Sequence, residues 1–247
     1  MKICRFTQAG AVFTGLFSDS TLTVCDETFN ATDQVYAADD VELLAPVTPS
    51  KIVCVGRNYA DHAAELGNAV PKEPLLFLKA PSAIVAHGAD IQIPYQSSQV
   101  EHEGELAVVI RQKCSHLTAD ENTADYILGY TCLNDVTARD VQRHDVQFTR
   151  GKSFDTFCPI GPYIETTFDP TDVRVQTLVN GEVRQDGSTA QMVFPVEFLV
   201  RYISQQMTLL PGDVIATGTP AGVSKMESGD VCEVRIEGLA TLRNTIR

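Results

Sequence analysis

The chain has 247 residues, of which 44% are hydrophobic, which allows one large domain with a buried core and excludes disorder as the main state. Its formal net charge of −13 repels polyanions, so we expect no nucleic-acid partner. No apolar run is long enough for a membrane span or a signal peptide, so we expect a cytoplasmic protein. The seven cysteines are scattered without a CxxC pair, which is typical of reduced thiols.

Residues 1–45 are predicted to form a small β-rich unit. The alternating stretches Ala11–Phe17 and Thr21–Cys25 are bounded by Gly, Asp, Ser and Asn, which favour turns. The segment Pro46–Pro49 then predicts a linker, because each proline disfavours helix before it. We therefore expect two units, residues 1–45 and a catalytic domain at 46–247.

The first half of the main domain is predicted to alternate short strands with two short helices. The helix at Arg57–Gly67 has Asn58 as a plausible N-cap and Gly67 as its left-handed end. Residues 119–128 are predicted to form the second helix. The strands are expected at 51–55, at 74–85 with a proline break, at 100–111 and at 130–135.

The second half adds one predicted helix, Val196–Gln206, and strands at 210–219, 229–238 and 239–246, which are separated by glycines. Strands and helices do not alternate regularly and no fixed repeat occurs. This pattern argues against a Rossmann fold, a TIM barrel and a solenoid. The sequence predicts an α+β, mostly β, fold with a mainly antiparallel core.

A pair of carboxylates marks the entry of one predicted strand into the core. Glu101, Glu103 and Glu105 share one face of the strand at 100–111, because side chains alternate along a strand. The apolar run that follows them predicts burial on both faces. Ionised carboxylates this close repel each other unless a cation lies between them. Oxygen ligands favour Mg²⁺ or Mn²⁺, with Ca²⁺ as a further candidate.

The third carboxylate of this predicted site is Asp135, which ends the strand at 130–135. Three protein oxygens leave positions free on an octahedral ion for a substrate and a water molecule. Asp140 is an alternative third ligand, and its place beyond a turn makes it the second choice.

Two further positions carry reactive groups. His62 and Glu65 lie three residues apart on the predicted helix, hence on one face, and a carboxylate beside an imidazole favours a general base. An ordinary surface contact is the alternative for such a pair. Lys152, at a predicted turn, is a candidate for stabilising an oxyanion. No phosphate loop is formed there, because Val146 stands where glycine is required.

Several motifs, in this order, resemble the fumarylacetoacetate hydrolase family over residues 51–247. They are VGRNYADHAAELG, LFLKAPSA, EHEGELAVVI, LNDVTARDVQ, RGKSFDTFCPIGP, VNGEVRQ and GDVIATGTPAGV. The resemblance implies a mixed β-roll, a homodimer and a Mg²⁺ or Mn²⁺ ion held by Glu103, Glu105 and Asp135. It also implies a lid that carries the His62–Glu65 dyad, an anion site with Lys152, and substrate-binding residues, namely Arg57, Asn58, Arg139, Gln142 and Thr219.

The resemblance implies an enzyme that acts on a small 2-oxo acid. Our leading hypothesis is a metal-dependent hydrolase that cleaves the carbon–carbon bond of acylpyruvate-type 2,4-dioxo acids. The alternatives on the same site are an oxaloacetate decarboxylase and a 2-hydroxyhepta-2,4-diene-1,7-dioate isomerase. A non-catalytic oxo-acid-binding protein is a fourth alternative, although such a protein has no need of a His–Glu base.

Overall fold

The computed structural model describes residues 1–247 and is dominated by β-strands, with four short α-helices. This confirms the α+β, mostly β, fold predicted from the sequence. Most strand pairs are antiparallel, and the parallel pairs β14–β8, β17–β6 and β19–β9 are the exceptions. None of the helices is both long and apolar enough to cross a membrane.

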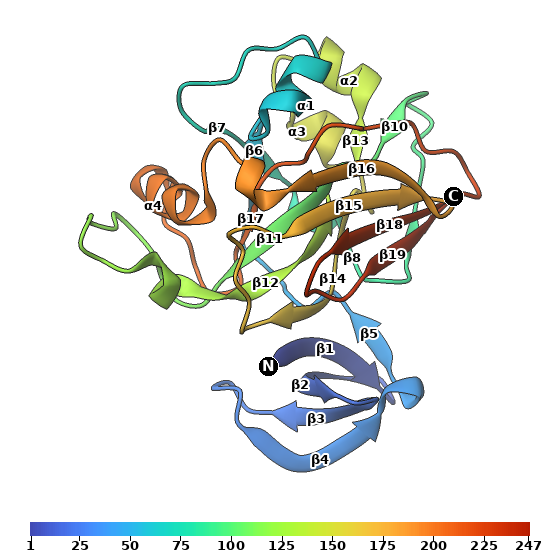
Figure 1. The fold of residues 1–247 in the computed structure, drawn as a ribbon. Helices are drawn as coiled ribbons and strands as arrows, with labels where there is room; N and C mark the ends of the chain where they lie inside the picture. Colours follow the sequence, from blue (N-terminus) through green and yellow to red (C-terminus); the bar gives the residue numbers. More distant parts are fainter.

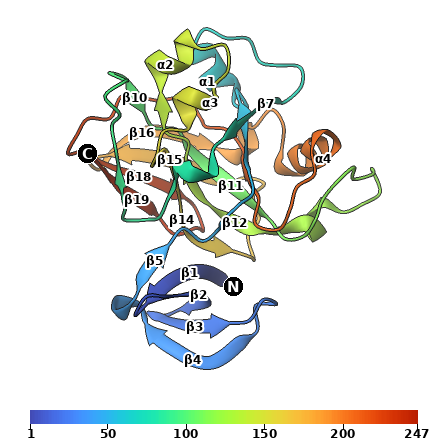
Figure 2. The same cartoon turned by 180° about the vertical axis from the view of Figure 1, so that it is seen from behind.

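The larger sheet runs through the whole molecule (Figures 1 and 2). Its main path follows the order β4-β3-β2-β1-β14-β12-β11-β17-β6-β7. These strands are β1 (Lys2–Gln8), β2 (Ala11–Ser18), β3 (Thr21–Cys25), β4 (Ala31–Ala37), β6 (Ile52–Gly56), β7 (Leu75–Lys79), β11 (Gly104–Ile110), β12 (Ile127–Asn134), β14 (Cys158–Glu165) and β17 (Val214–Ala216). Two short strands, β5 (Glu42–Leu44) and β8 (Ile84–Val85), pair with β1 and β14.

A second sheet lies against the middle of the first (Figure 1). Its order is β16-β15-β18-β19-β9, with β15 (Arg174–Val179), β16 (Glu182–Ser188), β18 (Val231–Ile236), β19 (Leu242–Ile246) and β9 (Asp90–Ile91). Leu106 and Val108 of β11 pack with Val175 and Val234 of this sheet, whereas Ala107 and Val109 belong to the core on the other face. The apolar run after Glu105 is therefore buried on both faces, as predicted.

The N-terminal strands form a separate lobe below the main body (Figure 1). Its small core contains Cys4, Phe6 and Leu22. The lobe continues the larger sheet because Lys2 and Ile3 of β1 pair with Glu165 and Ile164 of β14. The division into units at residues 45 and 46 stays a prediction.

Three short helices gather at one end of the larger sheet: α1 (Ala60–Glu65), α2 (Arg139–His144) and α3 (Thr149–Lys152) (Figure 1). The fourth helix, α4 (Val196–Gln206), has the predicted bounds and packs Leu199, Val200 and Ile203 into the core. Its apolar side chains recur at helical spacing, so one face is buried and the other is exposed.

The structure corrects three predicted elements. Residues 119–128 hold only a 3₁₀ turn at Thr123–Tyr126, because the Asn122 side chain accepts a bond from the Ala124 N–H and the chain then enters β12. The first helix is shorter than predicted and is preceded by Tyr59, so Asn58 is not its N-cap. The strand at 100–111 is interrupted at residues 102–103, because β10 (Val100–Glu101) pairs with β13 (Thr137–Ala138) while β11 pairs with β12.

Gly104, between the two predicted ligands Glu103 and Glu105, leaves no room for a side chain. A Cβ atom there would lie 2.0 Å from the Thr177 hydroxyl oxygen and 3.3 Å from the Val234 methyl groups. The Thr177 hydroxyl is buried and makes no hydrogen bond, so its removal breaks none. This strand junction therefore requires glycine for steric reasons.

We predict that Gly104→Ala lowers the free energy of unfolding by about 1–3 kcal/mol, the usual effect of overpacking a core. Urea denaturation measures the change. The same substitution in a Thr177→Ala background should cost clearly less, because the clashing oxygen is gone. Equal losses in both backgrounds would contradict this steric explanation.

Candidate active site

The ends of β11 and β12 bring the predicted metal ligands together. Gly104 is paired with Asn134, so Glu103 and Asp135 are the next residues beyond the paired ends. The Asp135 N–H donates to the Glu103 carbonyl at 2.8 Å, and the Asn134 side chain accepts from the Glu103 N–H at 3.0 Å. Glu105 follows one step inside the strand. The antiparallel register therefore explains why residues about thirty positions apart converge.

The carboxylates of Glu103, Glu105 and Asp135 form one buried cluster, in which one oxygen of each lies within 4.8 Å of the others. Asp140, the second choice for the third ligand, is wrong, because its carboxylate instead accepts bonds from Ser97 and Ser98. Glu101 is also outside the cluster, and it accepts a bond from Arg139 Nε at 2.7 Å.

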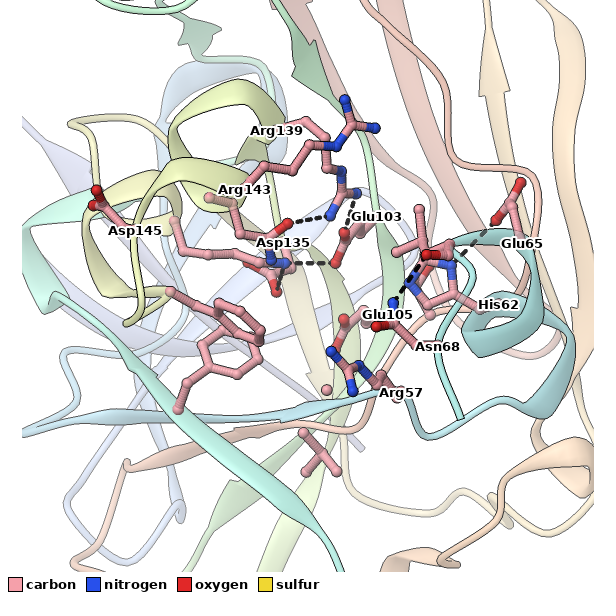
Figure 3. Close-up of a pocket in the computed structure, with 18 residues that line it drawn as sticks. Arg57, His62, Glu65, Asn68, Glu103, Glu105, Asp135, Arg139, Arg143 and Asp145 are labelled. Carbon is pink, nitrogen blue, oxygen red and sulfur yellow. Dashed lines mark hydrogen bonds and ion pairs between the residues drawn. The ribbon is translucent and has the colours of Figure 1, made fainter. Parts of the chain in front are cut away.

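Three buried cations surround these carboxylates. Lys152 Nζ lies 2.6 Å from both Glu103 Oε2 and Asp135 Oδ2. Lys79 Nζ lies 2.7 Å from Asp135 Oδ1. Arg139 donates from Nε to Glu101, from Nη2 to Glu103 and from Nη1 to the Gln142 side-chain oxygen. Figure 3 shows Arg139 and Glu103 in contact above the cluster.

Glu105 is the carboxylate that these cations do not reach. Its one protein partner is the N–H of Gly218, at 2.8 Å. Burial raises the pKa of Glu105 well above its usual range, and the charges of Asp135 and Glu103 raise it further. Burial acts the same way on Glu103, but Lys152 and Arg139 outweigh it and hold the pKa of Glu103 well below its usual range.

The charges of the cluster fit a divalent cation. Four buried carboxylates (Glu101, Glu103, Glu105 and Asp135) face three buried cations (Lys79, Arg139 and Lys152), so one negative charge is not compensated. A divalent ion would compensate it and leave one net positive charge, which suits an anionic substrate. The donors are all hard oxygens, the set that Mg²⁺, Mn²⁺ and Ca²⁺ prefer.

The cluster opens into a cavity of about 480 Å³ that α1 covers from one side (Figure 3). His62 and Glu65 of α1 line this cavity, and His62 Nδ1 lies 3.2 Å from Glu65 Oε2. The Glu65 carboxylate also accepts from the Gly222 N–H at 3.0 Å. In Figure 3 the His62 ring lies between Glu65 and the Glu103 and Glu105 carboxylates. The predicted pair therefore faces the cluster, with His62 Nε2 left free.

Among the predicted substrate-binding residues, Arg57, Arg139, Gln142 and Thr219 line the cavity. Asn58 does not: it is fully buried, and its amide bonds the backbone of Phe194 and Thr217, which corrects its prediction as a substrate ligand. Arg139 is engaged by protein carboxylates, so its geometry is that of a residue that positions Glu103.

The Thr219 hydroxyl belongs to a buried network that joins the two sheets. It donates to the Gly104 carbonyl at 2.8 Å and accepts from Gln185 Nε2 at 2.7 Å. Gln185, on β16, also accepts from the Gly104 N–H and bonds His102. Gln185 thus holds the ligand-bearing strand against the loop at 217–223, a role that its place in VNGEVRQ does not reveal.

Two further charged residues of the site, Lys79 and Arg143, were not predicted from the sequence. Lys79 stands in the apolar segment LFLKAP, where a single charge in an otherwise apolar strand signals a charged partner. Arg143 lies four residues after Arg139 in α2, and this spacing could have indicated that both arginines project from the same face of a helix.

Comparison with known proteins agrees with this geometry. The family described as fumarylacetoacetate (FAA) hydrolase C-terminal matches residues 51–247, and the domain described as Rv2993c-like, N-terminal, matches residues 1–46. The human mitochondrial oxaloacetate tautomerase FAHD2A is 43% identical over 92% of this chain and 76% of its own length. The oxaloacetate tautomerase YisK of Bacillus subtilis is 42% identical over 86% of this chain and 75% of its own length.

A solved structure has the same fold over the whole chain. The crystal structure of 2-hydroxyhepta-2,4-diene-1,7-dioate isomerase from Mycobacterium marinum superposes with a TM-score of 0.92 at 42% identity and covers 100% of this chain and 98% of that one. The chain belongs to the fumarylacetoacetate hydrolase family of enzymes.

Proposed function

We propose that this protein is a divalent-metal-dependent enzyme that interconverts the keto and enol forms of a small 2-oxo acid. The observation that carries the proposal is the buried cluster of Glu103, Glu105 and Asp135, which opens into the cavity faced by His62. The relatives named oxaloacetate tautomerase and the isomerase of the same fold support proton transfer as the reaction.

The three carboxylates would hold Mg²⁺ or Mn²⁺, with Ca²⁺ as a further candidate. When bound there, such an ion would supply Lewis-acid stabilisation of the negative charge that develops on the C2 oxygen of the substrate. Lys152 adds a fixed positive charge beside it. Burial lowers the pKa of Lys152, but Asp135 and Glu103 outweigh this effect and raise it, so Lys152 stays protonated.

His62 is the proposed proton carrier. With Nδ1–H donated to Glu65, the neutral ring has its acceptor at Nε2, on the cavity side. In the enolisation of oxaloacetate, the C3–H bond breaks, its proton goes to Nε2, and its electron pair forms the C2–C3 double bond. The C2 oxygen takes up the displaced charge and then a proton. Ketonisation is the reverse sequence.

Acylpyruvate hydrolysis, the hypothesis preferred from the sequence, is the second candidate. It is supported by the His62–Glu65 pair, because a base of this kind also takes a proton from an attacking water molecule. Oxaloacetate decarboxylation needs the same charge stabilisation at the C2 oxygen without attack by water. A non-catalytic binding protein gains least support, because it would not need the base.

We predict that His62→Ala lowers kcat for oxaloacetate tautomerisation by about 10²–10⁴-fold, the usual contribution of general-base catalysis. Loss of enol absorbance measures the rate. Oxalate should bind with little change, because it needs only the metal. Asp61→Ala, on the exposed side of α1, is the matched control and should keep full activity. A His62→Ala enzyme with the wild-type rate would remove His62 from the mechanism.

We predict that metal binding strengthens as pH rises until the pH passes the raised pKa of Glu105. A proton and the cation compete for this carboxylate, so binding releases a proton. Titration calorimetry with Mn²⁺, in buffers of different ionisation enthalpy, measures both effects. Glu105→Ala should weaken binding, remove the released proton and abolish turnover with the fold intact. Full activity in excess chelator, with metal absence confirmed by elemental analysis, would refute the proposal.

We also propose that the chain forms a homodimer. β4 is an edge strand of the larger sheet, and Val12 and Val35 near this edge are 57% and 55% exposed. An open edge with apolar side chains is a surface that a two-fold partner covers. We expect light scattering at micromolar concentration to give twice the mass of the chain, and Val35→Lys to weaken the association. The mass of one chain at these concentrations would contradict the proposal.

A further inference from the structure

The cavity is lined by four side chains that carry a permanent positive charge, and they divide into two kinds. Lys152 and Arg139 are buried and are bound to carboxylates of the cluster. Arg57 and Arg143 line the same cavity and make no ion pair with any carboxylate. Two guanidinium groups are therefore free to bind an anion, in a chain whose formal net charge is −13.

Arg143 is held at the mouth of the cavity by α2. It lies four residues after Arg139, so both project from one face of the helix. The helix is held firmly against α3, because a Cβ at Gly151 would lie 2.9 Å from the Gln142 backbone nitrogen. In Figure 3 the Arg143 guanidinium lies farther from the carboxylates than that of Arg139, and Arg143 is exposed whereas Arg139 is buried. Its one protein partner is Gln99 Oε1, at 3.3 Å.

Arg57 lines the same cavity, and in Figure 3 its guanidinium is seen on the side of Glu105, away from Arg143. Its backbone φ of 58° is uncommon for a residue with a side chain. This end is where the chelated part of a 2-oxo acid would sit. A second, distal carboxylate of the same substrate would point away from it, toward the mouth and Arg143.

We propose that Arg143 binds the distal carboxylate of a 2-oxo dicarboxylic acid and so selects diacids over 2-oxo monocarboxylic acids. This inference rests on the proposed function, because it takes the 2-oxo carboxylate end to lie at the cluster. The polar groups deeper in the cavity cannot neutralise a second anion: the Thr219 hydroxyl and the Arg139 guanidinium are already engaged by the protein. A planar guanidinium matches a carboxylate through two parallel bonds.

The test compares oxaloacetate with its 4-methyl ester, which keeps the reacting atoms and loses the distal charge. In Arg143→Gln, kcat/KM for oxaloacetate should fall about tenfold or more, the usual effect of losing a hydrogen bond to a charged group, while that for the ester changes less than about twofold. Arg174→Gln is the control for general charge, because Arg174 is exposed and pairs with Asp186 on the second sheet. Arg174→Gln should leave kcat/KM unchanged for both oxaloacetate and its 4-methyl ester.

Binding of 3,3-dimethyloxaloacetate, which has no proton to lose at C3, separates this inference from the proposed function. If wild-type protein with Mg²⁺ turns over neither substrate but binds this diacid more tightly than its 4-methyl ester, and Arg143→Gln removes the difference, the tautomerase proposal fails and the role of Arg143 stands. An unchanged preference for the diacid in Arg143→Gln would overturn the inference. Loss of that preference in Arg57→Gln alone would also overturn it, because the distal carboxylate would then lie at the other end.

Discussion

The burial of like charges at the paired ends of β11 and β12 is the constraint on which the rest of the site depends. Glu103, Glu105 and Asp135 are almost fully removed from water, where repulsion between carboxylates is screened least. This repulsion is reduced by three buried cations, Lys79, Arg139 and Lys152, each of which forms ion pairs with one or two buried carboxylates. With Glu101 counted, these three cations face four buried acids, and Glu105 is the acid that none of the cations reaches.

A site with this charge balance suits both a cation and an anionic substrate for the same reason. A divalent ion would overcompensate the remaining negative charge, and the carboxylate of the proposed 2-oxo acid would then restore neutrality. The buried lysines also fix the geometry of the ligands, since Asp135 has one oxygen on Lys79 and the other on Lys152. Groups oriented before the reaction need no rearrangement as charge develops on the substrate.

The loop at 217–223 contacts the carboxylate cluster, the second sheet and helix α1. Its Gly218 N–H holds Glu105, its Thr219 hydroxyl is bonded to Gly104 and Gln185, and its Gly222 N–H holds Glu65 of α1. One loop therefore contacts a metal-ligand candidate, the second sheet and the partner of the proposed base. A change in this loop would alter the orientation of His62 and of Glu105 together, which links the placement of the base to the placement of the metal.

Within such a scaffold, the outcome of the reaction depends on what reaches the base. His62 with a carbon-bound proton in reach supports tautomerisation or isomerisation, and His62 with a water molecule in reach supports hydrolysis. If Arg143 binds a distal carboxylate, as proposed, the mouth of the cavity decides which acid enters. Substrate choice and reaction type would then be set by groups around the cluster rather than by the three carboxylates themselves.

The sequence by itself determined the features that depend on local spacing. Alternation predicted that Glu103 and Glu105 point to one side, which holds although Glu103 lies just before β11. The apolar run after them predicted burial on both faces, and the three-residue spacing predicted that His62 lies beside Glu65. The family motifs then predicted the fold. Only the tertiary structure decided the long-range pairings: Lys79 reaches Asp135 across 56 positions, and Asn58 is bonded to Phe194, 136 positions away, instead of to substrate. Such partners leave no periodic signal, because sequence spacing fixes which face a side chain occupies but not which distant chain segment packs against that face.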